Sequence, residues 1–152
     1  MTEKSRLPGW LKPANRLIIA LQKTFGLSLG TMHVLSVPGR KSGKPRTIPL
    51  MVFNWNDERW LLSTLGEVNW VRNLRAAGHA TLSASRNEEP ERIRVVEVPS
   101  TEAARLIRDT IAKFPAVVQS NFDVTPGEPM EAFEREATRH PTFRIVPMQS
   151  TP

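Results

Sequence analysis

The chain has 152 residues, a formal net charge of +6 and no cysteine. Its length fits one domain, 1–152, and the lack of cysteine excludes disulfides, thiolate nucleophiles, thiolate zinc sites and iron–sulfur clusters. No apolar run is long enough to span a membrane and the first residues lack the apolar core of a signal peptide, so we expect a cytoplasmic protein.

An amphipathic helix is predicted over about 10–25, where apolar residues recur at spacings of three and four. Lys12, Arg16 and Lys23 fall away from the apolar stripe, and Gly26 is a plausible stop. Two interpretations stay open for this helix. It docks on its own domain, or it makes a peripheral contact with an anionic membrane.

Three strands are predicted next, over 31–37, 46–53 and 59–64, with a hairpin connection at 55–58. Pro49 cannot donate a ladder hydrogen bond, so it predicts an edge or a bulge in its strand. Both faces of 46–53 are apolar. One face can enter the core, and the other needs a cover such as a subunit, a helix or a flat ligand.

The second half of the chain alternates helices with a hairpin. We expect a helix over 68–77 ended by Gly78, strands over 79–85 and 91–98, and a helix over 101–113 capped by Ser100. One or two helical pieces follow within 116–139, and a last strand covers 143–146. Because hairpins join most strands, the order favours an α+β fold with a mostly antiparallel, barrel-like sheet and flanking helices.

Several kinds of catalytic site are missing from the sequence. There is no tyrosine, the three histidines are scattered, and neither a nucleophile elbow nor a Walker phosphate loop occurs. We expect no metal site, a hydrogen-bonded structural role for His33 and an exposed His79. If the protein is an enzyme, a cofactor must supply its chemistry.

The segment GRKSGKPR, from Gly39 to Arg46, lies between two predicted strands. Its two glycines allow the backbone N–H groups to converge on an anion, and Ser42 adds a hydroxyl donor. Arg40 and Arg46 carry forked donors that match phosphate or carboxylate oxygens. The alternative is a charged hairpin turn on the surface.

A second segment, Gly66 to Asn73, opens a predicted helix directly after a strand. The free N–H groups of a helix start attract anions and ring carbonyls. Trp70 offers a flat face, and Asn69 and Asn73 offer amide groups. The alternative is that Trp70 and Leu74 belong to the core.

Together, the run Gly39-Arg40-Lys41-Ser42-Gly43-x-Pro45-Arg46-x-x-Pro49-Leu50 and the later Trp70-x-x-Asn73-Leu74 resemble the deazaflavin-dependent nitroreductase and quinone reductase family. Members are small actinobacterial proteins with a split β-barrel of the FMN-binding type, and they use coenzyme F420. The resemblance implies that Arg40, Lys41 and Ser42 hold the phosphate region, that Arg46 meets the acidic tail, and that 47–51 lies along the deazaflavin. The implied cofactor-binding residues are Gly39, Arg40, Lys41, Ser42, Gly43, Arg46, Thr47, Ile48, Pro49, Leu50, Met51, Ser63, Thr64, Leu65, Gly66, Asn69, Trp70, Val71, Arg72 and Asn73.

The function implied is hydride transfer from F420H2 to a small hydrophobic, electron-poor acceptor such as a quinone, an activated enone or a nitroaromatic. No side chain stands out as the proton donor, which leaves Ser63 or solvent. Known nitro-reducing members carry tyrosines around the substrate, whereas a lid drawn from 114–133 here would rest on Phe114, Phe122 and Phe133.

Two alternatives remain at this point. The same fold can bind FMN, and a basic chain can be a non-enzymatic binder of nucleic acid or anionic membrane. The aromatic residues do not interleave with basic ones as in nucleic-acid recognition, so we expect no nucleic-acid partner. The sequence is compatible with a monomer or a homodimer.

Overall fold

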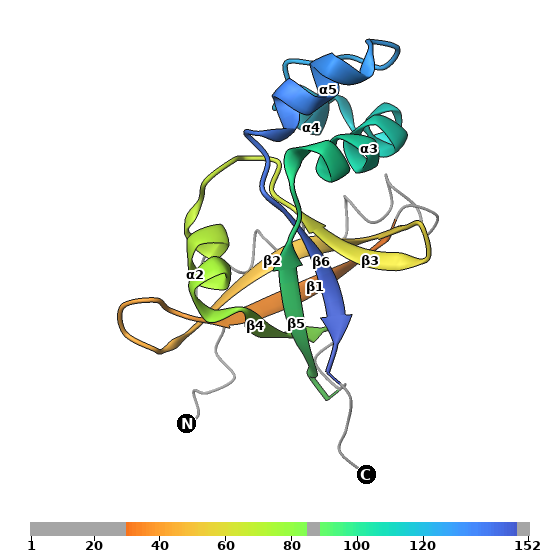
Figure 1. Ribbon diagram of the computed structural model, residues 1–152. Helices are drawn as coiled ribbons and strands as arrows, with labels where there is room; N and C mark the ends of the chain where they lie inside the picture. The colour runs from red at the N-terminus through yellow and green to blue at the C-terminus, as the bar shows by residue number, and fades with distance from the viewer. Residues whose placement is uncertain (1–29, 85–88, 149–152) are drawn as a thin grey trace.

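The structure, a computed structural model, describes residues 30–84 and 89–148. Six strands close into a barrel in the order β1-β2-β3-β6-β5-β4, and each neighbouring pair is antiparallel (Figure 1). This confirms the expected α+β split-barrel fold. The strands are β1 Gly30–Pro38, β2 Pro45–Trp55, β3 Glu58–Leu62, β4 His79–Ser83, β5 Glu91–Glu97 and β6 Thr142–Pro147.

Strands β1 and β2 form a long ribbon that pairs from Gly30 opposite Phe53 to Pro38 opposite Pro45. β3 pairs only with the last residues of β2, from Phe53 onward. The stretch around Pro49 therefore has no partner on that side among the described residues, which confirms the predicted edge. The β2–β3 turn uses Asn56 and Asp57 at φ values of 56° and 63°, the left-handed geometry of a tight hairpin.

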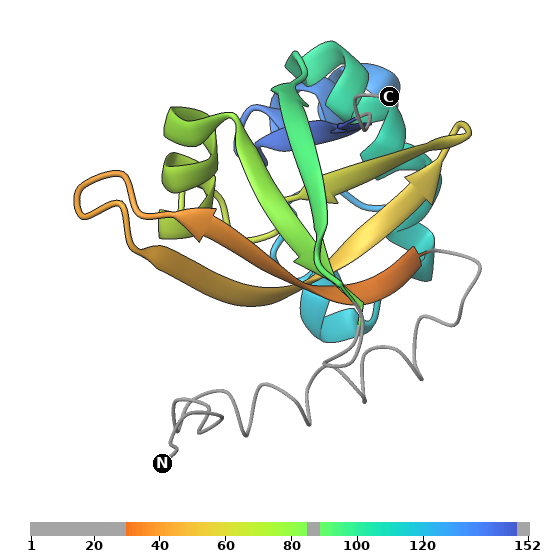
Figure 2. The same cartoon turned by 90° about the horizontal axis from the view of Figure 1, so that it is seen from below.

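The helices lie on two sides of the barrel. α2 (Asn69–Ala77) lies beside the β1–β2 loop (Figures 1 and 2). The other helices form a second group away from that loop: α3 (Ser100–Thr110), α4 (Ala116–Gln119) and α5 (Met130–Ala137). A 3₁₀ turn over Ile111–Lys113 follows α3. Gly78 ends α2 as predicted, in a left-handed conformation with its N–H donating to Leu74. The cap predicted at Ser100 is wrong, because Pro99 occupies that position and Ser100 is already helical.

Two apolar clusters explain the two apolar faces of β2. On one face, Val52 belongs to the apolar cluster inside the barrel, and Ile48 and Leu50 pack against that cluster. On the other face, Met51 and Phe53 pack among side chains from α3 to α5. The cover that the sequence required for the second face is therefore supplied largely by helices.

The helix expected over 10–25 lies outside the described residues, as does most of the hairpin tip expected at 86–90. Within 30–84 and 89–148, no helix has the length and apolar character needed to cross a membrane.

Candidate functional site

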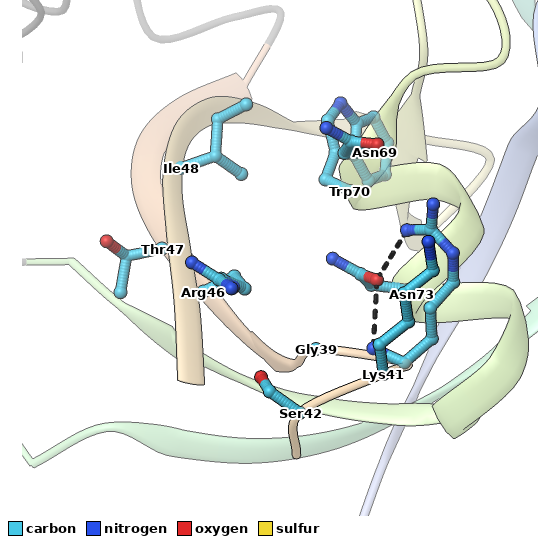
Figure 3. A pocket seen from close by; sticks show the side chains of 10 residues that line it. Gly39, Lys41, Ser42, Arg46, Thr47, Ile48, Asn69, Trp70 and Asn73 are labelled. Atoms are coloured by element: carbon cyan, nitrogen blue, oxygen red, sulfur yellow. Dashed lines mark hydrogen bonds between the residues drawn. The ribbon is translucent and has the colours of Figure 1, made fainter. Parts of the chain in front are cut away.

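A polar cavity of about 430 Å³ opens between the β1–β2 loop, β2 and the start of α2 (Figure 3). The two segments singled out in the sequence thus meet at one place, although about 30 residues separate them. None of the described residues that line the cavity is acidic. They are Gly39, Arg40, Lys41, Ser42, Arg46, Thr47, Ile48, Asn69, Trp70 and Asn73.

Asn73 of α2 binds the β1–β2 loop through two hydrogen bonds. Its side-chain oxygen accepts hydrogen bonds from the backbone N–H of Arg40 at 3.1 Å and from Nη1 of Arg40 at 2.8 Å. Only 5% of Asn73 is exposed, so the two bonds form in a sheltered position. The amide nitrogen of Asn73 points away from Arg40 into the cavity, where it can donate to a ligand (Figure 3).

Within the loop, Gly43 has a φ of 74°, and its N–H donates to the carbonyl of Gly39. The N–H of Gly39 donates to the carbonyl of Lys44, and the hydroxyl of Ser42 accepts from the N–H of Lys44. A Cβ at residue 39 would press on Lys44 and Ser42 at 3.2 Å. The loop is a defined turn closed by its own hydrogen bonds.

The cations of this loop have no carboxylate partner in the described part of the chain. Arg40, Lys41, Lys44 and Arg46 form no ion pair there, whereas Arg59, Arg75, Arg108, Arg139 and Arg144 each contact an acidic side chain. Exposed cations concentrated beside a cavity attract an anionic ligand. The loop therefore offers positive charge that the described fold does not neutralise.

An apolar cavity of about 350 Å³ adjoins the polar one, and Ile48 and Trp70 line both. β2 forms one wall, the turn after β3 another, and the segment around α4 a third. A ligand with an anionic end and a flat apolar end can thus occupy both cavities. The lining residues are Met32, Ile48, Pro49, Leu50, Met51, Phe53, Leu62, Ser63, Thr64, Leu65, Trp70, Val117, Val118 and Asn121.

The turn that lines the apolar cavity is closed by hydrogen bonds. The hydroxyl of Ser63 donates to the carbonyl of Gly66 at 2.6 Å, and the N–H of Val68 donates to the same carbonyl at 2.9 Å. Gly66 has a φ of 88°, which favours glycine. The proton of the Ser63 hydroxyl is therefore engaged within the turn.

Behind the turn lies a buried pair that the sequence analysis missed. Nε2 of His140 is 2.6 Å from a carboxylate oxygen of Glu136, and Nδ1 is 2.9 Å from the carbonyl oxygen of Ser63. Burial raises the pKa of Glu136, but hydrogen bonds from His140, Arg139 and the backbone of Asp123 outweigh it and leave the pKa below its usual value. The spacing of four residues between Glu136 and His140 was the available signal.

Most residues expected at the site line one of the two cavities, but four do not. Val71 is fully buried in the barrel interior, and Arg72 is exposed on α2. Gly43 closes the loop, and Gly66 faces a third cavity behind the turn. Six further residues reach the apolar cavity only through the fold and carry no local signal for this role: Met32, Phe53, Leu62, Val117, Val118 and Asn121.

Two histidines and three phenylalanines singled out in the sequence also have defined positions in the structure. Nδ1 of His33 lies 3.1 Å from the carbonyl of Thr31, and His79 is exposed, both as predicted. Phe114, Phe122 and Phe133 are buried in the cluster beneath the α4 segment, while Val117, Val118 and Asn121 face the cavity.

Comparison with known proteins gives one family and a set of distant folds. The family model described as F420H(2)-dependent quinone reductase matches residues 17–125. The search of the curated proteins gives no significant match.

Several solved structures resemble the fold, and at their low sequence identity the likeness shows the fold alone. One is a putative 5-nitroimidazole antibiotic resistance protein from Bacteroides thetaiotaomicron (14% identity, 88% of this chain and 80% of that one, TM-score 0.53). Another is the heme storage protein HutZ from Vibrio cholerae (13% identity, 92% of each chain, TM-score 0.52). An F420-H2 dependent reductase is 19% identical over 76% of this chain and 93% of that one, with a TM-score of 0.48.

Proposed function

The chain belongs to the F420H(2)-dependent quinone reductase family, and from this premise we propose that it binds F420 across the two joined cavities and reduces a flat, electron-poor acceptor. The observation that carries the proposal is that a cavity lined by cations without an acidic partner among the described residues adjoins an apolar cavity, with Ile48 and Trp70 lining both.

The residues present fit this cofactor. F420 combines a flat deazaflavin ring with a phosphate and an oligoglutamate tail, so it needs an apolar slot beside a cluster of donors. Arg40, Lys41 and Ser42 would hold the phosphate region, with the amide nitrogen of Asn73 as a further donor. Arg46, on the β2 side of the opening, would meet the acidic tail (Figure 3).

The ring would lie in the apolar cavity along the β2 stretch from Ile48 to Met51, beside Trp70. The turn that begins at Ser63 and the α4 segment form the remaining walls. When bound, reduced F420 supplies two electrons and a proton to the acceptor. The contribution of this chain is to bind, to orient and to exclude water from the reacting faces.

The character of the second cavity supports an apolar acceptor. Leu65 and Val117 line it and are 70% and 72% exposed, so two large apolar side chains remain free to contact a second ligand. We propose a quinone, with activated enones and nitroaromatics as competing classes. Because the hydroxyl proton of Ser63 is engaged with Gly66, we assign the proton that completes the reduction to solvent and a positioning role to Ser63.

The test is a pair of titrations followed by an activity assay. We expect F420 to bind the purified protein, seen as a change in cofactor fluorescence, and FMN to bind weakly or not at all. Oxidation of F420H2 should then depend on added naphthoquinone, with a nitroaromatic and an enone assayed in parallel.

Three outcomes would contradict the proposal. Absence of F420 binding at low salt would refute it. A yellow, FMN-loaded protein, or binding of any polyanion with a steep salt dependence and no F420H2 oxidation, would favour the alternatives named above.

A further inference from the structure

The buried pair behind the apolar cavity has no role in the proposal above. His140 is 3% exposed and Glu136 is 3% exposed, and the ring of His140 stacks on Phe122 with centroids 4.1 Å apart. Both residues lie beyond residue 125, where the match to the family model ends. A buried ionisable pair beside the wall of a binding cavity is a candidate for a functional role.

The hydrogen bonds of His140 determine its protonation. A backbone carbonyl can only accept, so Nδ1 must carry a proton to bond to Ser63. Glu136 also accepts from Arg139 and from the backbone N–H of Asp123, as expected of an ionised carboxylate, so Nε2 must carry a proton as well. His140 makes both bonds only as an imidazolium.

Charged groups from several segments surround the pair. Glu136 and Arg139 come from α5 and the residues after it, and Asp123 comes from the segment before α5 and pairs with Arg139 at 3.0 Å. Glu67, which precedes α2 and pairs with Arg75, lines the same third cavity. Arg139 and Arg75 thus pair with the three carboxylates on this side of the ring.

The imidazolium is joined directly to the turn that lines the apolar cavity. All three polar groups of Ser63 are bonded: its N–H to Pro141 at 3.0 Å, its hydroxyl to Gly66, and its carbonyl to His140. Ser63, Thr64 and Leu65 all line the cavity. Loss of either ring proton leaves one of the two acceptors without its donor, and the Ser63 carbonyl is the neutral, weaker acceptor.

We propose that His140 is a positioning residue for the reductase reaction. As an imidazolium that bridges Glu136 and the Ser63 carbonyl, it holds the Ser63–Gly66 turn in place as a wall of the apolar cavity. Deprotonation releases this wall. The role in the reaction rests on the proposed function, whereas the protonation of His140 and its link to the turn do not.

The first experiment uses the wild-type protein without cofactor. In a ¹⁵N-labelled sample, long-range ring correlations should show protons on both nitrogens of His140 at neutral pH, with the signal assigned by its loss in His140→Gln. As the pH rises and His140 loses a proton, the backbone amides of Gly66 and Val68 should shift with the same midpoint. A neutral His140 at neutral pH, or a Gly66 amide that stays unchanged, overturns the inference.

The second experiment measures kcat and KM against pH. Wild-type kcat/KM for the quinone should fall at alkaline pH with the midpoint seen for His140. His140→Gln and Glu136→Gln should lower kcat/KM by about tenfold at neutral pH and lose this alkaline step, while the Kd for F420 changes by less than about threefold. Glu131→Gln removes a charge from the exposed side of α5 and should behave as wild type.

The outcomes separate the two proposals. If wild-type protein neither binds F420 nor oxidises F420H2, the proposed function fails, and the NMR titration still decides the role of His140 in the turn. If the variants fold and keep both the wild-type rate and the alkaline step, His140 does not position the site. If they do not fold, the wild-type titration and pH profile decide.

Discussion

Replacing Asn73 by leucine should weaken F420 binding with little effect on the barrel. The change removes the acceptor of two hydrogen bonds from Arg40, one from its backbone N–H and one from its guanidinium. Leucine has the same branched arrangement of side-chain heavy atoms as asparagine but is apolar, and the site is 5% exposed and next to fully buried Leu74. The main consequence of losing the two hydrogen bonds should therefore be a change in the position of the β1–β2 loop.

The magnitude follows from the two bonds. A neutral hydrogen bond contributes about 1 kcal/mol and one from a charged donor about 1.5–3 kcal/mol. Arg40 is exposed, so water replaces part of what it loses, and we expect a net effect of about 1–2 kcal/mol, or about 5–30-fold in the Kd for F420.

Asn73→Asp separates anchoring from ligand contact. An aspartate keeps an acceptor for both Arg40 bonds but replaces the donor that faces the cavity with a negative charge (Figure 3). It should weaken F420 binding more than Asn73→Leu does, because the cofactor is anionic.

The assay is a fluorescence titration with F420, accompanied by thermal unfolding. Asn54→Leu makes the same chemical change at an exposed position of β2 that lines neither cavity, and it should leave the Kd unchanged. A Kd for Asn73→Leu within about twofold of wild type would refute the reasoning, since twofold corresponds to only about 0.4 kcal/mol.

Three further predictions concern charge, the ring wall and pH. If Arg46 contacts the acidic tail, Arg46→Ala should weaken the free energy of F420 binding by about 1.5–3 kcal/mol, and added salt should reduce the difference from wild type. The control is Arg92→Ala, which removes an exposed arginine of β5 and should leave the Kd unchanged. Equal Kd values for the two variants would remove Arg46 from the site. Met51→Leu conserves volume in the apolar cluster, so unfolding should change by less than about 1.5 kcal/mol while kcat/KM changes; a large loss of stability with normal kinetics would assign Met51 to the core alone. Since the folded pKa of Glu136 lies below its usual value, the ionised group stabilises the fold above about pH 4.3, and this contribution is lost as the pH falls through the folded pKa. The melting temperature of wild type should therefore exceed that of Glu136→Gln at neutral pH and approach it in acid, and a constant difference down to the acid limit would contradict the assignment.

The strands, the turns and the cation-rich loop over 39–46 were predictable because their signals are local. Alternating apolar residues indicate strands, Asn56-Asp57 and Gly78 suit turns that need left-handed backbone, and the glycines and cations of the 39–46 loop predict an anion site. The predicted cap at Ser100 failed because Pro99 suits the extended position before a helix equally well.

Other features depend on which segments meet, and no local pattern indicates that. Val71 and Arg72 lie beside Trp70 in sequence, but the direction in which α2 packs sends Val71 into the barrel and Arg72 to solvent. The α4 segment reaches the apolar cavity only because α3 and α5 pack over one face of β2.

The amino-acid sequence alone determined the antiparallel barrel and the chemistry of the loop, because periodicity, turn residues and charge act within a few residues of one another. Only the tertiary structure decided that the carbonyl of Ser63 meets the imidazole of His140, 77 residues away, and that Glu136 faces the other ring nitrogen. That contact depends on the pairing of β3 with β6 and on the packing of α5, which long-range burial selects from many arrangements that satisfy the same local patterns.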